Sequence, residues 1–284
     1  MITVQSIGGY ATIQDLGRPG YMKFGIPHSG SMDLVSSNQA NQLLENALNT
    51  PVIELFGGEM VLYCECSALF SVTGAEVTVE TEMGVYTSPC KVYVDAGQKL
   101  KIGRVNNGNI VYLGIKGGID TQMSFDSAST YLPANYGGNT GNPLRAGDQV
   151  IPNKSTFPAQ DNLCFPRKVY YPNSLKIRVL QGPEFDLLNT ESKQILFTES
   201  FEIGETNRMG YRLKGNHLSA QAEKLTSRVV LKGVIQLPPD GQPIILLSDA
   251  QTTGGYPRIL QVSEEDLNYL VQMGRGDRVR FLIG

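Results

Sequence analysis

Short runs of β-branched and alternating hydrophobic residues recur along the chain, and each run is bounded by glycine or a polar turn. Examples are "AEVTVETEMGVYTS" and "NIVYLGIKGG" in the first half, and "SRVVLKGVIQLP" and "DRVRFLIG" in the second. Alternation with period two is typical of strands with one buried face. The pattern therefore predicts a mainly β protein made of many short strands.

A small turn followed by a strand occurs at residues 96–100, 146–150 and 275–279. In each turn a glycine can adopt the positive φ that a tight turn requires. This repetition predicts barrel-like meanders in both halves of the chain. The stretch 151–172 is Pro-rich and aperiodic, and it predicts the connection between the two halves.

Two segments have helical spacing instead. In "MDLVSSNQANQLLENALN" the apolar residues Ala40 and Leu44 share one helical face, and Asn41 is expected to face the other way. The second predicted helix runs over residues 264–273, with Ser263 as its N-cap. Helices are therefore expected to be few and short.

Composition and charge exclude several classes of partner. The 284 residues carry 24 Lys and Arg against 27 Asp and Glu, a net charge of −3, without a basic cluster that would bind nucleic acid. No apolar run approaches the roughly 20 residues of a membrane span. The first residues lack the features of a signal peptide, so a cytoplasmic location is expected. With two histidines and four cysteines, neither a metal site nor a disulfide scaffold is expected.

Common catalytic motifs are absent from the sequence. There is no P-loop, no strand followed by G-x-G-x-x-G, and no G-x-S-x-G elbow. An autonomous nucleotide site is therefore not expected. Any catalysis would depend on carboxylates, hydroxyls, arginines and backbone amides.

Three glycine-rich segments are candidates for the site. "DAQTTGGYP" follows an apolar strand, where Asp249 could act as a base and the glycine N–H groups could bind an anion, or the segment is only a hairpin. "RMGYRLKG" places Arg208 and Arg212 on either side of an aromatic residue, suited to carboxylate or phosphate recognition or simply exposed. "NYGGNTGNPLRAGD" loosely resembles a phosphate loop.

Ordered motifs over nearly the whole chain carry a family resemblance. They are "TIQDLGRPGY", "GIPHSGSMD", "GGID", "LRAGD", "NRMGYRL", "DAQTTGGYP" and "GDRVRF". The sequence resembles the urea amidolyase-related family, also called the biotin-dependent carboxyltransferase A/B-type or allophanate hydrolase subunit 2-like family. The resemblance implies two tandem cyclophilin-like open β-barrel subdomains with a few short helices, over about residues 1–160 and 161–284. It also implies a partner protein resembling subunit 1 of the same system.

The resemblance also implies a set of site residues. Asp249, Asp15 and Arg18 are the expected catalytic residues. The expected substrate-binding residues are Asp33, Asn41, Arg145, Arg208, Tyr211, Thr252, Thr253, Gly254 and Tyr256. Two positions depart from the family pattern, because Ala250 and Asn142 stand where arginine is common. Each departure removes a possible contact to an anion.

Three functions are compatible with this resemblance. The first is a subunit of an ATP-dependent 5-oxoprolinase, which opens the lactam of 5-oxoproline to L-glutamate, with ATP bound by the complex and not by this chain alone. The second is a carboxyltransferase acting on urea or a related small amide, with biotin on a partner carrier. The third is a non-catalytic protein that binds an inhibitor of a histidine kinase.

Overall fold

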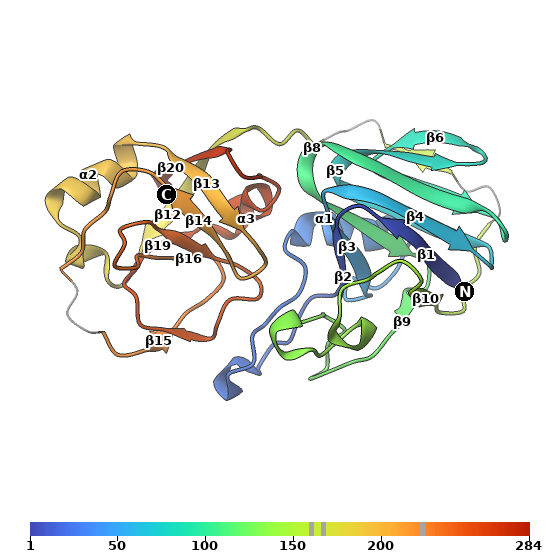
Figure 1. Cartoon of the computed structure of the whole chain (residues 1–284), viewed down its shortest axis with the longest axis horizontal. Helices are drawn as coiled ribbons and strands as arrows, with labels where there is room; N and C mark the ends of the chain where they lie inside the picture. The colour runs from blue at the N-terminus through green and yellow to red at the C-terminus, as the bar shows by residue number, and fades with distance from the viewer. Residues whose placement is uncertain (159–161, 166–168, 222–224) are drawn as a thin grey trace. The chain divides into compact units, whose positions relative to one another are not determined.

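The computed structural model describes residues 1–158, 162–165, 169–221 and 225–284. They form two compact units, one of residues 1–18 and 29–171, the other of residues 19–28 and 172–284. Figure 1 shows that strands dominate both units, and the mainly β class is thereby confirmed. The expected boundary was between residues 160 and 161, whereas the units divide between Tyr171 and Pro172 and the short segment 19–28 belongs to the second.

The first unit is an 11-stranded sheet organised around one long strand, β8 (Lys99–Ile115), which pairs with β3, β4 and β5. Inward-facing side chains of this sheet, among them Phe70, Val72 and Leu113, form the core. The other strands are β1 (Ile2–Ile7), β2 (Tyr10–Gln14), β3 (Val52–Phe56), β4 (Gly58–Cys64), β5 (Ala68–Thr81), β6 (Gly84–Thr87), β7 (Cys90–Val94), β9 (Ile119–Asp120), β10 (Gln149–Pro152) and β11 (Leu163–Cys164).

One helix, α1 (Leu34–Leu43), covers part of β5 and β8. The hydroxyls of Ser71 and Thr73 on β5 donate to the C=O groups of Ala40 and Ser36, so polar contacts attach the helix to the sheet. Ala40 and Leu44 are buried as predicted. The predicted outward orientation of Asn41 is wrong: the residue is buried, because its amide satisfies carbonyl groups of the loop after the helix.

The second unit is a closed barrel, where an open one was expected. Closure comes from β12 (Ser174–Gln181) and β20 (Arg278–Ile283), which pair in parallel over six residues. Tyr211, Phe201 and Phe281 fill the interior. The remaining barrel strands are β13 (Phe201–Thr206), β14 (Gly210–Lys214), β16 (Val234–Gln236), β17 (Ile244–Leu246) and β19 (Arg258–Val262); β15 (Arg228–Val229) and β18 (Thr253–Gly254) form a separate ribbon.

Two further helices belong to the second unit. The predicted helix over residues 264–273 is confirmed as α3 (Glu264–Leu270), which ends three residues earlier, and the Ser263 hydroxyl accepts from the N–H of Asp266 at 3.4 Å. α2 (Thr190–Thr198) was not predicted, because its large apolar residues are consecutive and show no helical spacing. Short 3₁₀ turns are η1 (Met22–Phe24), η2 (Leu132–Ala134), η3 (Asn139–Gly141) and η4 (Phe185–Leu187). Among the described residues, no helix is both long and apolar enough to cross a membrane.

All three predicted turns before strands are confirmed, and Gly97 with φ of +85° precedes β8 by two residues. Gly147 and Gly276 each have φ of +94°, and β10 and β20 begin two residues later. An added Cβ at either glycine would meet no neighbouring atom, so backbone conformation alone favours glycine there.

Candidate functional site

Asp15 directly follows β2 and is 7% exposed. Its Oδ1 accepts from the hydroxyls of Ser127 and Ser129, both at 2.6 Å, and from the N–H of Gly17 at 2.8 Å. Its Oδ2 accepts from the N–H of Ala128 at 2.7 Å. All of these donors belong to the protein itself, and they join residues 127–129 to the bend after β2. The geometry therefore favours a positioning role for Asp15 over direct catalysis.

Arg18 is completely buried and bonds to residues 124–129, which include the segment bound by Asp15. Its Nε donates to the C=O of Ser124 at 3.1 Å, and its Nη2 donates to the C=O of Ser129. The guanidinium stacks over the ring of Tyr136, 4.7 Å from the centroid, which adds a cation–π attraction. Arg18 thus fixes a positive charge among the loops of the first unit.

Asp33 and Asn41 organise the two ends of α1. The Asp33 carboxylate caps the helix by accepting from the N–H and hydroxyl of Ser36 at 3.0 and 2.6 Å. The Asn41 amide donates to the C=O groups of Leu48 and Thr50 at 3.2 and 2.8 Å. Both side chains therefore bond to the protein itself, which favours support of the helix over direct contact with substrate.

A buried acid that sequence reasoning missed lies next to this cap. Glu54 on β3 is fully buried, and its Oε2 accepts from the N–H of Met32 and the hydroxyl of Tyr112, both at 2.7 Å. The N–H of Asp33 donates to that hydroxyl at 2.8 Å. Burial, and then the charges of Glu54 and Asp33, raise the pKa of Tyr112 well above its usual value. The available signal was a lone acid inside the apolar strand "VIELF".

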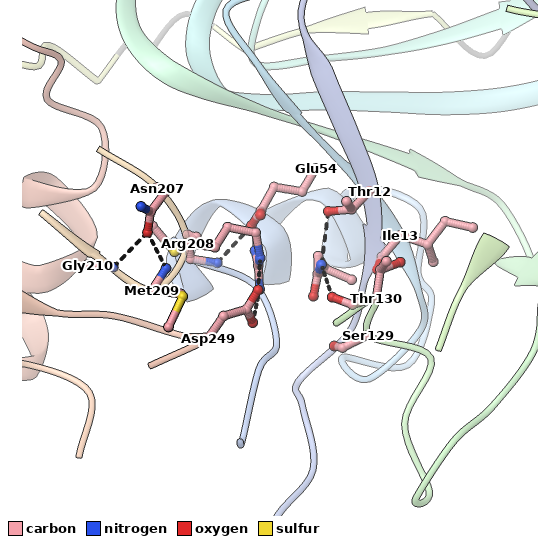
Figure 2. A network of polar contacts seen from close by, with 12 residues as sticks. Thr12, Ile13, Glu54, Ser129, Thr130, Asn207, Arg208, Met209, Gly210 and Asp249 are labelled. Atoms are coloured by element: carbon pink, nitrogen blue, oxygen red, sulfur yellow. Dashed lines mark hydrogen bonds and ion pairs between the residues drawn. The ribbon is translucent and has the colours of Figure 1, made fainter. Parts of the chain in front are cut away.

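In the second unit, two candidate motifs that are 41 residues apart in the sequence meet as an ion pair. Arg208 lies between β13 and β14, and Asp249 follows β17. The guanidinium donates to both carboxylate oxygens, Nε at 2.8 Å and Nη2 at 3.0 Å (Figure 2). Arg208 is 5% exposed and Asp249 is 2% exposed. A bidentate pair with this burial holds both segments in a fixed geometry.

A cavity of about 300 Å³ lies on the outer face of the barrel, over β14, β16 and β17. Its polar lining includes Asn207, Arg212, Gln236 and Gln251. Gln251 Nε2 donates to Gln236 Oε1 at 3.2 Å, whereas Gln251 Oε1 accepts no hydrogen bond from the described residues. The Arg212 guanidinium, which is partly exposed, forms an ion pair with Asp240. Neither glutamine was among the expected site residues, although Gln251 lies within the candidate segment "DAQTTGGYP".

The segment "DAQTTGGYP" contributes Gln251 and Tyr256 to the lining of this cavity. Thr252 is buried, and its C=O accepts from the N–H of Val230 at 3.1 Å, whereas Thr253 is exposed. A Cβ at Gly254 would lie 2.5 Å from Gln236 Nε2, so a larger residue would displace the end of that glutamine side chain. Tyr256 is 46% exposed and also lines a neighbouring cavity of about 420 Å³. Thr253 and Tyr256 are thus the expected site residues of this segment that are most open to solvent.

Among the described residues, Tyr256 is the one expected site residue that lines this cavity. Tyr211 points into the barrel and donates its hydroxyl to the C=O of Val271 at 2.9 Å, because strand alternation turns Arg212 outward and Tyr211 inward. Tyr211 is completely buried and therefore contributes to the barrel core. Arg145 is exposed in a turn of the first unit, where its N–H donates to Asp148.

The two departures from the family pattern have different surroundings. Ala250 is 8% exposed and packs in a small apolar cluster with Val230, Val234 and Leu246, so a small apolar side chain suits this position. Asn142 is exposed, and its amide donates to the C=O of Thr140 at 3.2 Å.

A second buried carboxylate supports the ribbon that carries Gly254. Glu184 is 5% exposed and accepts from Arg258 Nε and Nη2, both at 2.9 Å, and from Arg228 Nη1 at 2.5 Å. Hydrogen bonds from Arg258 are the main cause that lowers the pKa of Glu184 to about 2. Arg228 is paired with Gly254 across the ribbon. Glu184 therefore connects the barrel strand β19 to the ribbon of β15 and β18.

Comparison with known proteins gives consistent matches. Residues 24–283 match the family model described as carboxyltransferase domain, subdomain A and B. The chain is 34% identical over 284 residues to the 5-oxoprolinase C subunit of Escherichia coli, covering 91% of it, and 36% identical over 285 residues to that of Haemophilus influenzae, covering 90%. The crystal structure of the Kluyveromyces lactis urea carboxylase aligns with 99% of the chain at a TM-score of 0.90 and 27% identity. The chain spans only 27% of that much longer protein.

Proposed function

Because the chain belongs to the family of carboxyltransferase domains with subdomains A and B, we propose that it is the C subunit of an ATP-dependent 5-oxoprolinase. In this role it works with partner subunits to open the lactam of 5-oxoproline to L-glutamate. One observation carries the proposal: along 99% of its length the chain matches two proteins that are named as C subunits of 5-oxoprolinase.

The cavity on the second unit supports a small amide as substrate. The lactam of 5-oxoproline offers one N–H and one C=O, and its carboxylate carries a negative charge. Gln251 Oε1 is suited to accept from the lactam N–H, and Arg212 is suited to the carboxylate because a guanidinium binds it in two places. The Arg208–Asp249 pair holds the segment from which Gln251 extends.

The chemistry needs activation of the amide, because an amide carbonyl is a poor electrophile. Transfer of a phosphoryl group from ATP to the lactam oxygen makes the ring carbon open to attack by water, and phosphate then leaves. Arginines near the substrate would stabilise the negative charge that develops. We assign ATP to the complex and expect a partner that resembles subunit 1 of related systems. Asp15 and Arg18 are assigned to positioning in the first unit, and exposed Arg145 to contact with ligand or partner.

A second candidate function rests on the structural match to urea carboxylase. In that reaction carboxybiotin on a separate carrier would give its carboxyl group to the nitrogen of urea or a related amide. The same amide-binding cavity would serve, because both reactions begin with an N–C=O group. Biotin dependence separates the two candidates experimentally.

The test is reconstitution with candidate partner subunits, including one that resembles subunit 1 of related systems. We expect glutamate release from 5-oxoproline and ATP when all subunits are present, and a loss of release when this chain is omitted. Avidin, which sequesters biotin, should have no effect. Release that persists without this chain would reject the proposal. Release that avidin abolishes, or carboxylation of urea in its place, would support the second candidate.

Replacing Gln251 by leucine tests the assignment of the cavity. The variant removes the acceptor for the lactam N–H and keeps a similar volume. Loss of one hydrogen bond of about 1.4 kcal/mol predicts a tenfold lower kcat/KM for 5-oxoproline. Gln242→Leu is a matched control, because Gln242 bonds only to Gly215 and Asp240 among the described residues. Equal kinetics for the Gln251 variant and the control would place substrate binding elsewhere.

A further inference from the structure

Cys90 and Cys164 lie directly opposite each other at the edge of the first unit's sheet. They are partners in the antiparallel pairing of β7 with β11. The N–H of Phe165 donates to the C=O of Pro89 at 3.1 Å, so the neighbouring pair, Phe165 with Pro89, is a hydrogen-bonded pair of the antiparallel ladder. Because the two kinds alternate in an antiparallel ladder, Cys90 and Cys164 form a non-hydrogen-bonded pair.

This kind of pair has the spacing that a disulfide requires. In non-hydrogen-bonded pairs the Cα atoms are about 4.5 Å apart and the side chains share one face. Disulfides are found at Cα separations of about 4.4–6.8 Å. The other two cysteines, Cys64 and Cys66, are two positions apart in one segment, and Cys66 lies in the bend after β4, where its Sγ accepts from the N-terminal amine of Met1 at 3.1 Å. Among the described strands, no pairing places their sulfur atoms opposite each other. Cys90 and Cys164 are therefore the better placed of the two pairs.

The two thiols of the cross-strand pair differ in their surroundings. All four cysteines are free, and Cys164 is exposed whereas Cys90 is buried in the core. Burial, and then the neighbouring Cys164, raise the pKa of Cys90 to about 12. A reagent in solution therefore meets Cys164 first, and Cys90 reacts only with a sulfur already held beside it.

We propose that Cys90 and Cys164 form a reversible oxidation site, which closes a cross-strand disulfide by exchange with a small disulfide such as oxidised glutathione. The Cys164 thiolate attacks one sulfur of the reagent, the reagent's S–S bond breaks, and one small thiol leaves. Cys90 then attacks the Cys164 sulfur of the mixed disulfide, and the second small thiol leaves. Two electrons and the two protein thiol protons pass to the two small thiols, so the exchange balances.

The bond would fix a short edge strand. β11 contains only two residues, and its neighbour Asn162 accepts from the N–H of Tyr93 on β7 at 2.6 Å. A covalent link at this edge would resist local opening and would hinder pairing of the exposed edge with another chain. The site lies in the first unit and does not depend on the function proposed for the cavity of the second.

The test is thiol counting and peptide mapping of the full chain after exposure to oxidised glutathione. We expect the free thiols to fall from four to two, with Cys90 and Cys164 in one linked peptide pair that dithiothreitol releases. The oxidised protein should also melt several degrees higher. Cys164→Ser should abolish the link, and the matched control Cys66→Ser should keep it. A stable glutathione adduct on Cys164, a link between Cys64 and Cys66, or no loss of thiols would overturn the proposal.

Discussion

Asp249→Ala is expected to abolish chain-dependent glutamate release and to lower the free energy of unfolding of the second unit by about 3 kcal/mol or more. The physical reason is the buried guanidinium of Arg208, which loses the carboxylate that binds it at 2.8 and 3.0 Å. Removing one member of a buried ion pair costs far more than removing one member of an exposed pair. Hydrogen exchange of the barrel amides measures the loss in that unit alone, because the two units need not unfold together.

A double variant separates stability from function at this pair. Arg208→Met with Asp249→Leu removes both charges, so it should recover much of the stability while glutamate release stays lost. The matched surface control is Asp186→Ala, which breaks the exposed pair with Lys193 and should change neither property measurably. If Asp249→Ala keeps full stability, the ion pair does not support the barrel. If the double variant regains activity, the pair has no role in the reaction.

Acidification is expected to weaken the second unit between about pH 4.5 and pH 2. The ordinary pKa of Glu184 is near 4.5, and its arginine partners lower it to about 2 in the folded state. A carboxyl group with a lowered pKa contributes stability that is fully present above its unfolded pKa and is lost as the pH falls through the folded value. A difference of one pKa unit corresponds to about 1.4 kcal/mol, so the loss over this range is about 3 kcal/mol.

Glu184→Gln provides the control for this pH dependence. Glutamine keeps the shape of the side chain but leaves the guanidinium groups of Arg258 and Arg228 without their counter-charge. The variant should therefore be less stable than the natural chain at pH 7 and should converge towards it as the pH approaches 2. Parallel unfolding curves for the two proteins at pH 7 and pH 3, with a constant difference, would show that Glu184 does not carry the effect.

Elements defined by local patterns were predictable from the sequence. The strand alternation gave the mainly β class, and the glycine turns before β10 and β20 were located to the residue. α3 was recognised because Ser263 and the acidic first turn form a local capping signal. α2 was missed because its stability depends on what it packs against and not on a spaced apolar face.

The buried hydrogen bonds and ion pairs that hold the site residues in place were less predictable, because each buried polar group binds a partner that is distant in the sequence. Arg208 and Asp249 were both expected at the site, yet nothing local indicates that they bind each other. Glu54 and Glu184 were not expected at all, since a single acid within an apolar segment is ordinary until its donors are known. Tyr211 was expected to bind substrate because it lies in the motif "NRMGYRL". In the structure its side chain points into the barrel interior, because side chains alternate between the two faces of β14.

The parallel pairing of β12 with β20 also sets an order of events during synthesis. β12 leaves the ribosome about a hundred residues before β20. β13 also pairs with β20, so one edge of β13 stays unpaired until β20 has been synthesised. Until then the barrel is an open sheet with two unpaired edges, which exposes its apolar interior to other nascent chains. Residues 19–28 are made even earlier and belong to the same unit. The second unit should therefore depend on chaperones that shield nascent chains more than the first unit does.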